Sequence, residues 1–308
     1  MFNRISTHRV LNIGLCATLA LGMLGTAAPQ TTTAAAGTSA SASSTQTPTG
    51  PGSAGAGRAG LASGRPRTLF NSGDPTLTLT PPLGGSRGAP PGSAPPNPDP
   101  RDFDGVWWLQ GYEYLLGPAP GVPPPLKPKY MKLLEERIRA KNRGTPEADT
   151  ETQCLSHGMP RLMESPYPIE IVQTPGRITF LHEVAHEVRR IYLDRPHPRH
   201  VRLSFLGDSV GHWEGDTLVV DTVGLDDRPF LDDEGSAHST QLHVIEHYRK
   251  TDGGANLELT ITVIDPVTME HPYSYHRIYH WRPDVRPQEY ICEENNRNAP
   301  VNGITVAK

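Results

Sequence analysis

Apolar and polar residues alternate along most of the chain after Pro168, which is the pattern of strands with one buried face. The alternating runs are rich in β-branched and aromatic residues, as strands are. The pattern predicts strands at Gly105–Tyr112, Ile169–Thr174, Arg177–Glu183, Glu187–Leu193, Val210–Trp213, Thr217–Val223, Gln241–Arg249, Asn256–Ile264, Tyr273–Trp281 and Gln288–Cys292.

Short turn sequences separate several of these runs. Pro175-Gly176, Glu214-Gly215 and Asp252-Gly253-Gly254 are typical of hairpins between antiparallel strands. An antiparallel meander of this length avoids exposed edges by closing on itself. We therefore expect a mainly β fold with a closed barrel that encloses a small ligand, and an open sheet covered by a helix is the alternative.

One helix is predicted ahead of the strands. It begins at Pro128, which suits a first helical turn, and ends at Gly144. Its apolar stripe consists of Tyr130, Leu133, Leu134 and Ile138. The basic residues on its other face, which include Arg137 and Lys141, are expected to be solvated.

The chain divides into three parts by composition. Residues 1–28 have the layout of a signal peptide, with Arg4 and Arg9 before an apolar run and small residues after it. Residues 29–101 are mostly Thr, Ala, Ser, Gly and Pro, which predicts a disordered tether. Residues 102–308 are then the β-barrel domain. The protein is expected to be periplasmic or secreted, with no membrane span after signal cleavage.

Charge and cysteine content narrow the partners and the compartment. Seven of the 29 basic and two of the 33 acidic residues precede Asp102, which leaves 22 against 31 in the domain and a net charge near −9. A nucleic-acid partner is excluded on this ground, because binding phosphates needs the opposite sign. Cys154 and Cys292 remain after signal removal, and an even pair in an exported protein predicts one disulfide.

The segment His182-Glu183-Val184-Ala185-His186 spells H-E-x-x-H, the signature of zinc peptidases. The motif requires a helix, whereas its flanks have strand composition. In a strand, His182 and His186 would lie ~13 Å apart, too far for one metal ion. If Val184-Ala185 is a turn, the two histidines become cross-strand neighbours, so a metal-dependent hydrolase stays open as an alternative.

Several longer stretches resemble a widespread group of exported bacterial β-rich proteins of unassigned activity. They are Asp104-Gly105-Val106-Trp107, Pro166 to Pro175, Val188 to Tyr192, Gly211 to Val220 and Cys292-Glu293-Glu294-Asn295. The Gly105-Val106-Trp107 opening is also similar to that of lipocalin-like barrels. The resemblance implies a lipocalin-like barrel and no particular activity.

Acidic residues on otherwise apolar strand faces are the candidates for chemistry. The alternation places Glu246 inside the barrel and gives Asp221 a similarly apolar face. A buried carboxylate needs a cation or a raised pKa, so either buried ion pairs or proton transfer follows. We predict Glu246 and Asp221 as acid and base, with His186 or His243 as proton partner and Arg190 holding charge.

A row of aromatic residues could contact a ligand or form an ordinary core. Tyr275, Tyr279 and Trp281 share one strand face, and Tyr192 is a further candidate for substrate binding. The leading hypothesis is cofactor-free acid/base chemistry of the isomerase, dehydratase or cyclase type on a small, largely apolar molecule. A non-catalytic ligand-binding protein is the second hypothesis. The ligand, the oligomeric state and the presence of a metal are left open.

Overall fold

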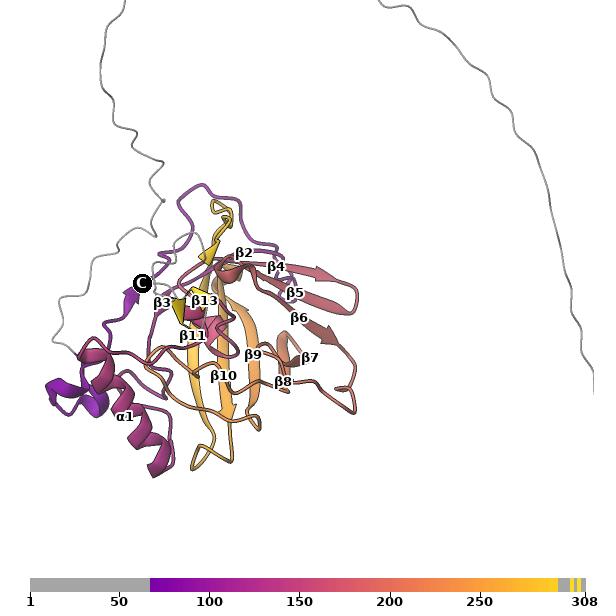
Figure 1. Cartoon of the computed structure of the whole chain (residues 1–308). Coiled ribbons are helices and arrows are strands. Elements are labelled where there is room, and N and C mark those ends of the chain that lie inside the picture. Colours follow the sequence, from indigo (N-terminus) through magenta and orange to yellow (C-terminus); the bar gives the residue numbers. More distant parts are fainter. Residues whose placement is uncertain (1–66, 293–299, 302–303, 306–308) are drawn as a thin grey trace, which may run out of the picture. The chain divides into compact units, whose positions relative to one another are not determined.

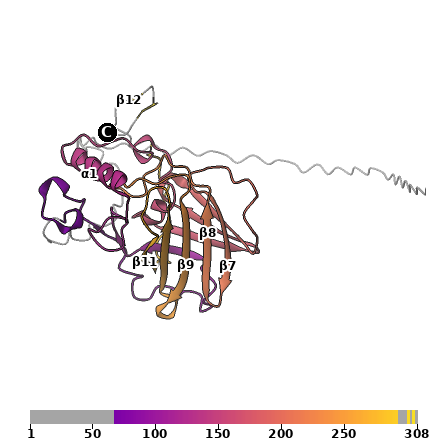
Figure 2. The same cartoon turned by 90° about the horizontal axis from the view of Figure 1, so that it is seen from below.

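Nine strands form a closed barrel in the computed structural model, which describes residues 67–292, 300–301 and 304–305. The order around the barrel is β10-β11-β2-β4-β5-β6-β7-β8-β9, and β9 pairs with β10 to close it (Figures 1 and 2). The strands are β2 (Gly105–Leu109), β4 (Ile169–Thr174), β5 (Arg177–His182), β6 (Val188–Leu193), β7 (Asp208–Glu214), β8 (Thr217–Val223), β9 (His243–Thr251), β10 (Asn256–Ile264) and β11 (Tyr273–Trp281).

The predicted class is confirmed: the fold is mainly β, with a closed barrel and an α-helix, so the open-sheet alternative is wrong. The sheet differs from a pure meander at one place in the described residues, where β6 and β7 run parallel. Residues 194–207 connect these two strands along the outside of the barrel (Figure 1). Residues 288–291 form no strand, contrary to the prediction. Cys292 is a single residue in helical conformation.

Helix α1 (Pro128–Asn142) lies outside the barrel wall in both views (Figures 1 and 2). Its buried residues are Leu134 and Ile138 of the predicted stripe. The chain entering the helix is attached to the turn between β10 and β11, because the Lys127 amide donates to the Thr268 carbonyl at 2.8 Å. No helix of the described residues is long and apolar enough to cross a membrane.

The segment from Arg67 to Arg101 differs from the tether that its composition predicts. Leu69, Leu77 and Leu79 are buried in the hydrophobic core. Strand β1 (Leu83–Gly84) pairs with β3 (Gly111–Tyr112) in a separate two-stranded sheet. A few leucines in the Pro- and Gly-rich sequence are therefore enough to fix this part of the chain. Residues 1–28, predicted to be a signal peptide, and residues 29–66 lie outside the described residues.

Two further short strands complete the described elements. They are β12 (Pro300–Val301) and β13 (Ile304–Thr305), which pair with each other in an antiparallel two-stranded sheet.

Large side chains from every barrel strand except β7 face the interior. Those that are almost completely buried include Trp107, Leu109, Ile171, Phe180, Ile191, Val220, Tyr248, Leu259, Ile261 and Tyr279. The short helix η4 (Arg161–Glu164) packs on this core: Tyr279 donates its hydroxyl to the Met163 carbonyl, and Arg277 donates to Glu164 at 2.5 Å. The inner face of the barrel is thus largely apolar, and Tyr279 and Arg277 add hydrogen bonds that hold η4 on it.

Candidate functional site

The buried carboxylate predicted inside the barrel is present. Glu246 of β9 forms an ion pair with Arg189 of β6, and their side chains are 0% and 1% exposed. Arg189 Nη1 donates to Glu246 Oε1 at 2.8 Å, and Tyr248 donates its hydroxyl to the same oxygen at 2.7 Å. Arg189 Nη2 also donates to Ser209 and Thr222 at 3.2 and 3.0 Å.

The charges of this interior pair are matched one to one. Burial alone would lower the pKa of Arg189, but the Glu246 carboxylate outweighs it and raises the pKa above its usual value. Arg189 therefore stays charged, and the two side chains hold each other in place. This arrangement cross-links β6 and β9 through the interior.

The arginine that contacts Glu246 is Arg189. Arg190 was predicted to hold charge at this site, and that placement is wrong. Successive side chains of a strand point to opposite faces, and the inner face of β6 carries Arg189 and Ile191. Arg190 is exposed on the outer face. Because two arginines adjoin in β6, the predicted assignment of side chains to the inner and outer faces was shifted by one residue.

Asp221 also lies outside, contrary to the expected apolar burial. The inner face of β8 consists of Leu218, Val220 and Thr222, all completely buried, whereas the Asp221 side chain is 41% exposed. Valines occupy both faces of this strand, so the period-two pattern did not distinguish inside from outside.

Asp221 and His243 nevertheless contact each other on the outer face. Asp221 Oδ1 lies 2.9 Å from His243 Nε2 and 3.1 Å from His197 Nε2. His197 Nδ1 lies 2.7 Å from Asp208 Oδ1. Because His197 belongs to the β6–β7 connection, these contacts attach that connection to the barrel wall. A catalytic role for Asp221 and His243 stays a prediction.

The H-E-x-x-H segment forms the end of β5 and the turn η5 (Val184–His186), so it is a hairpin. His182 is buried, and neither of its ring nitrogens has a hydrogen-bond partner among the described residues. His186 is exposed, and its Nε2 accepts from the Tyr290 amide at 3.1 Å. The two histidines thus have different surroundings, and a metal ion shared between them stays a prediction.

The predicted aromatic residues divide between the interior and the outside. Tyr275 and Tyr279 of β11 are buried in the core. Trp281 packs edge-on against Trp107, with ring centroids 5.3 Å apart. Tyr192 lies on the outer face of β6. Their role in substrate binding stays a prediction.

A cleft of about 360 Å³ lies beside the barrel end at which β4 begins and the β5–β6 turn sits. Its walls are α1, the loops 146–157 and 230–235, and the segment before β4. Four tyrosines and many ionisable groups line it. The tyrosines form two pairs in ring contact: Tyr112 with Tyr114 at 4.6 Å and Tyr167 with Tyr290 at 5.2 Å between centroids.

A single buried guanidinium contacts three carboxylates in this cleft. Arg161 is 3% exposed and donates to Asp149 at 2.9 Å, to Glu151 at 2.5 Å and to Asp233. Burial and the adjacent Glu234 raise the pKa of Asp233 to about 8, whereas contact with Arg161 favours its ionised form. One guanidinium thus faces three carboxyl groups, unlike the one-to-one pair inside the barrel.

His157 stands between two carboxylates at the bottom of the cleft. Its Nε2 lies 3.5 Å from Glu151 Oε1, and its Nδ1 lies 3.9 Å from Glu187 Oε1. Burial opposes a charge on the imidazole, but the contacts with Glu151 and Glu187 outweigh it and raise the pKa of His157. Burial likewise opposes ionisation of Glu151, yet His157 and Arg161 lower its pKa to about 2.

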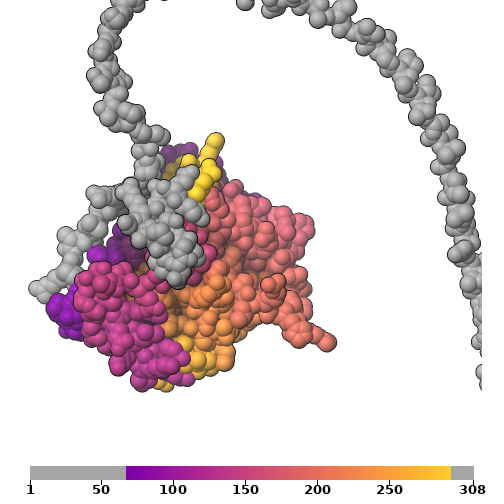
Figure 3. Space-filling view, in the orientation of Figure 1, coloured from indigo at the N-terminus to yellow at the C-terminus, as the bar shows by residue number. Residues whose placement is uncertain are grey.

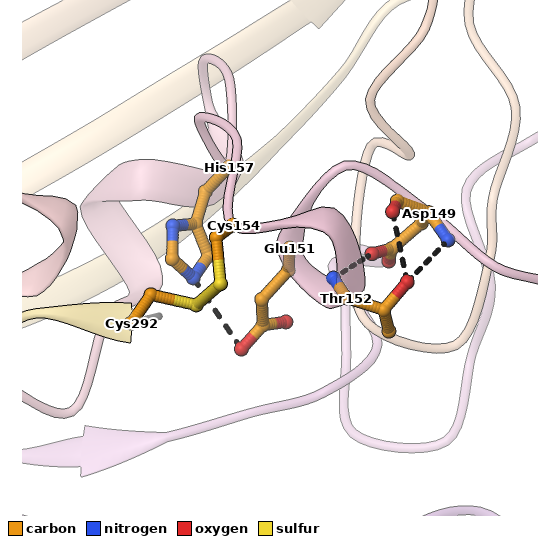
Figure 4. Close-up of a disulfide and its surroundings, with 6 residues drawn as sticks. All are labelled: Asp149, Glu151, Thr152, Cys154, His157 and Cys292. Carbon is orange, nitrogen blue, oxygen red and sulfur yellow. Dashed lines mark hydrogen bonds and ion pairs between the residues drawn. A yellow bond between two sulfur atoms is a disulfide. The ribbon is translucent and has the colours of Figure 1, made fainter. Parts of the chain in front are cut away.

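The backbone around His157 is fixed by short-range contacts and by the disulfide. Glu187 accepts from the Ser156 hydroxyl at 2.6 Å and from the His157 amide at 3.2 Å. Cys154 bonds to Cys292 with 5.6 Å between the Cα atoms, which confirms the predicted disulfide. Figure 4 shows this bond together with the contact of His157 and Glu151.

The opposite wall is built by α1 and the acidic loop after residue 231. Asp232 is buried and accepts from the amides of residues 234, 235 and 236 at 3.1, 3.0 and 3.0 Å, which fixes the loop. From α1, Arg137 donates to the Gly235 carbonyl at 2.7 Å, and Lys141 pairs with Glu234. The basic face of the helix is thus partly engaged and not simply solvated.

Sequence reasoning missed Arg161, His157, Glu151 and Asp233, because they lie in loops without strand or helix periodicity. Two signals point to them in retrospect. Glu151 and His157 flank Cys154 closely in sequence, and Asp232-Asp233-Glu234-Gly235 is an acidic run in a loop. Loops held by a rigid scaffold are where binding residues concentrate.

No group of three or more His, Cys, Asp or Glu side chains in the described part of the chain is arranged to hold a metal ion. No family model matches this sequence, and no curated protein matches it. Among solved structures, a luciferase domain from the dinoflagellate Lingulodinium polyedrum is similar over 73% of this chain and 58% of that chain, at 11% identity and a TM-score of 0.28. A likeness this weak carries no argument about activity.

Proposed function

We propose that the cleft beside the barrel end binds a small molecule and that His157 transfers a proton to or from it. The observation that carries this proposal is the position of His157, which lines the cleft between Glu151 and Glu187. The raised pKa of His157 means that its imidazole takes up a proton more readily than an ordinary histidine, which suits a group that donates a proton to a ligand.

The two carboxylates have different tasks in this proposal. Glu187 lies on the Nδ1 side and is held by Ser156, so it orients the imidazole and stabilises the imidazolium. Glu151, 49% exposed, remains ionised and keeps charge in the cleft next to Nε2. The tyrosine pairs supply flat apolar walls for the non-reacting part of the ligand. Isomerisation, dehydration or cyclisation can proceed with these parts: a positioned imidazole, carboxylates beside it and apolar walls that hold the ligand.

A binding protein without turnover is the second candidate. It is favoured by the pairing of the charged cleft residues with one another, since Arg161, Arg137 and Lys141 already neutralise most of the carboxylates. Export to the periplasm or the medium is part of both proposals, and the disulfide supports it.

Comparison of wild type with His157→Gln separates the two candidates. Native mass spectrometry of both proteins, incubated with a small-molecule extract of the producing cells, identifies what binds, and quantitative mass spectrometry identifies what is consumed. We expect consumption by wild type and binding without consumption by His157→Gln. His212→Gln, at an exposed histidine whose side chain lies 3.0 Å from Glu214, is the matched control. Equal consumption by wild type and His157→Gln would contradict the proton-transfer role.

A further inference from the structure

Three arginines meet around Tyr192 on the outer face of β5 and β6. Arg177 pairs with Tyr192 across the two strands, and Arg190 pairs with Thr179, so the two arginines are diagonal neighbours on one face. The guanidinium of Arg195, from the β6–β7 connection, lies 3.6 Å from the centre of the Tyr192 ring.

None of these three guanidinium groups has an anionic partner within the described residues: each lacks both an ion pair and a side-chain hydrogen bond. Asp194 adjoins Arg195 in sequence without an ion pair to it, and Asp208, which lines the neighbouring cavity, contacts His197 at 2.7 Å. Three unneutralised positive charges in a domain with a net charge near −9 are unexpected. Within the described part of the chain, these three positive charges are not paired with a carboxylate, so an external anion can bind them.

A second cavity adjoins this group at Arg190 and Tyr192, whereas Arg177 and Arg195 lie outside its lining. Its volume is about 280 Å³, and Arg190, Tyr192, Asp208 and Ser209 are among its lining residues. The parallel pairing of β6 with β7 begins only at Ile191 and Ser209, so the two strands diverge before that point and leave a notch in the barrel wall. Arg190 lines this notch from outside, and the buried Arg189 lies beneath it.

The connection that carries Arg195 is held in position. His197 contacts Asp208 and Asp221 from within it. Val201 packs so closely on Gly224 that a Cβ at that glycine would lie 2.2 Å from Val201 Cγ1. In the space-filling view the segment near residue 200 projects from the barrel surface (Figure 3). Arg195 thus lies in a connection whose position is fixed by these contacts.

We propose that the outer surface around Tyr192, where Arg177, Arg190 and Arg195 lie beside the notch, binds a phosphate group, either free or carried on a larger molecule. A tetrahedral oxyanion accepts hydrogen bonds in several directions, which suits guanidinium groups that approach from β5, β6 and the connection. A carboxylate has only two oxygens in one plane and fits three such donors less well. Arg199 and Arg202, both exposed on the same connection, add positive potential that attracts an anion.

Calorimetric titration of the full chain with inorganic phosphate tests the site. In Arg177→Gln/Arg190→Gln/Arg195→Gln we expect binding to weaken about tenfold or more, because charge-assisted hydrogen bonds to phosphate are lost. Arg249→Gln removes the same charge at an exposed position on β9 and is expected to change affinity by less than about twofold. Near-ultraviolet circular dichroism checks that all variants remain folded.

Cosedimentation with phosphatidylglycerol vesicles, against phosphatidylcholine vesicles alone, distinguishes the source of the phosphate. Vesicle binding that the triple substitution abolishes, without binding of free phosphate, supports a lipid-borne phosphate at this site. Binding of free phosphate alone supports a soluble ligand. Binding of neither, or equal weakening by Arg249→Gln, would overturn the proposal. None of these outcomes depends on His157 or on the cleft.

Discussion

The barrel interior and the end cleft both place a buried arginine next to carboxylates, yet they differ in stoichiometry and access. Inside, Arg189 meets one carboxylate, Glu246, and also donates to the hydroxyl groups of Ser209 and Thr222. In the cleft, Arg161 meets three carboxylates, and one of them, Glu151, is half exposed. A matched, enclosed pair stabilises a fold, whereas an unmatched, accessible cluster is poised to respond to a ligand or to a proton.

The largest expected effect concerns the disulfide that holds the cleft loop. The paired substitution Cys154→Ser/Cys292→Ser opens a link across 138 residues, which in the chain-entropy model costs about 5 kcal/mol of the unfolding free energy. Urea denaturation under oxidising conditions measures it. A loss below about 1 kcal/mol would mean that the cleft wall is held by its other contacts.

Glu246→Gln leaves Arg189 buried without its counter-charge, and we expect a loss of about 3–5 kcal/mol in the unfolding free energy. Replacing both partners, as Arg189→Met/Glu246→Leu, is expected to recover most of this loss. Glu258→Gln, on the exposed face of β10, is the control and should be nearly neutral. If the double replacement is as unstable as Glu246→Gln alone, the pair is more than a structural cross-link.

His182 lies where the two regions meet, and its effect depends on pH. Burial, helped by the charges of Arg189 and His157, lowers the pKa of His182 to about 3. The unfolded chain takes up this proton below its ordinary pKa of 6.5 while the folded chain does not, so stability is lost as pH falls from 6.5 towards 3. We expect a loss of about 2 kcal/mol between pH 6.5 and pH 5.

Thermal or urea unfolding as a function of pH checks this slope. His182→Leu is expected to remove it, because the neutral side chain takes up no proton in either state. His212→Leu, at an exposed histidine, should retain it. A slope that survives His182→Leu would assign the acid sensitivity to other groups.

The smallest expected effect is that of Glu151→Gln in the cleft. Contacts with His157 and Arg161 overcome burial and lower the pKa of Glu151 to about 2, so its contribution is present above pH 4.5 and is lost as pH falls towards 2. The side chain is half exposed, and solvent screening limits the contribution to about 1 kcal/mol or less. A larger loss, comparable with that of Glu246→Gln, would contradict the distinction between the two regions.

Sequence periodicity predicted the barrel because each strand buries one face over many residues. The same signal placed Glu246 inside correctly, since its neighbours Val244 and Tyr248 are apolar and the alternation there is unambiguous. It failed at Asp221, where both faces of β8 carry valine, and at Arg190, where two arginines adjoin. In both places a one-residue shift moves a side chain to the other face.

The cleft was beyond this kind of reasoning for a different physical reason. Arg161 and Asp233 are 72 residues apart in sequence and meet only through the packing of two loops on the barrel. No local pattern encodes such a contact, whereas the disulfide could be predicted because two cysteines leave a single pairing. The parallel contact of β6 with β7 was missed as well, since hairpin signals suggested antiparallel neighbours throughout.

That parallel contact follows from parity. Strands that alternate in direction around a closed ring must be even in number, and the ring formed by the described residues has nine. One adjacent pair must therefore run the same way, and the chain has to travel back along the barrel to begin the second strand of that pair. Residues 194–207 make this return journey, and they bring Arg195 to the face of β6. A barrel of eight or ten antiparallel strands would need no such return connection. Arg195 would then not be brought to the face of β6.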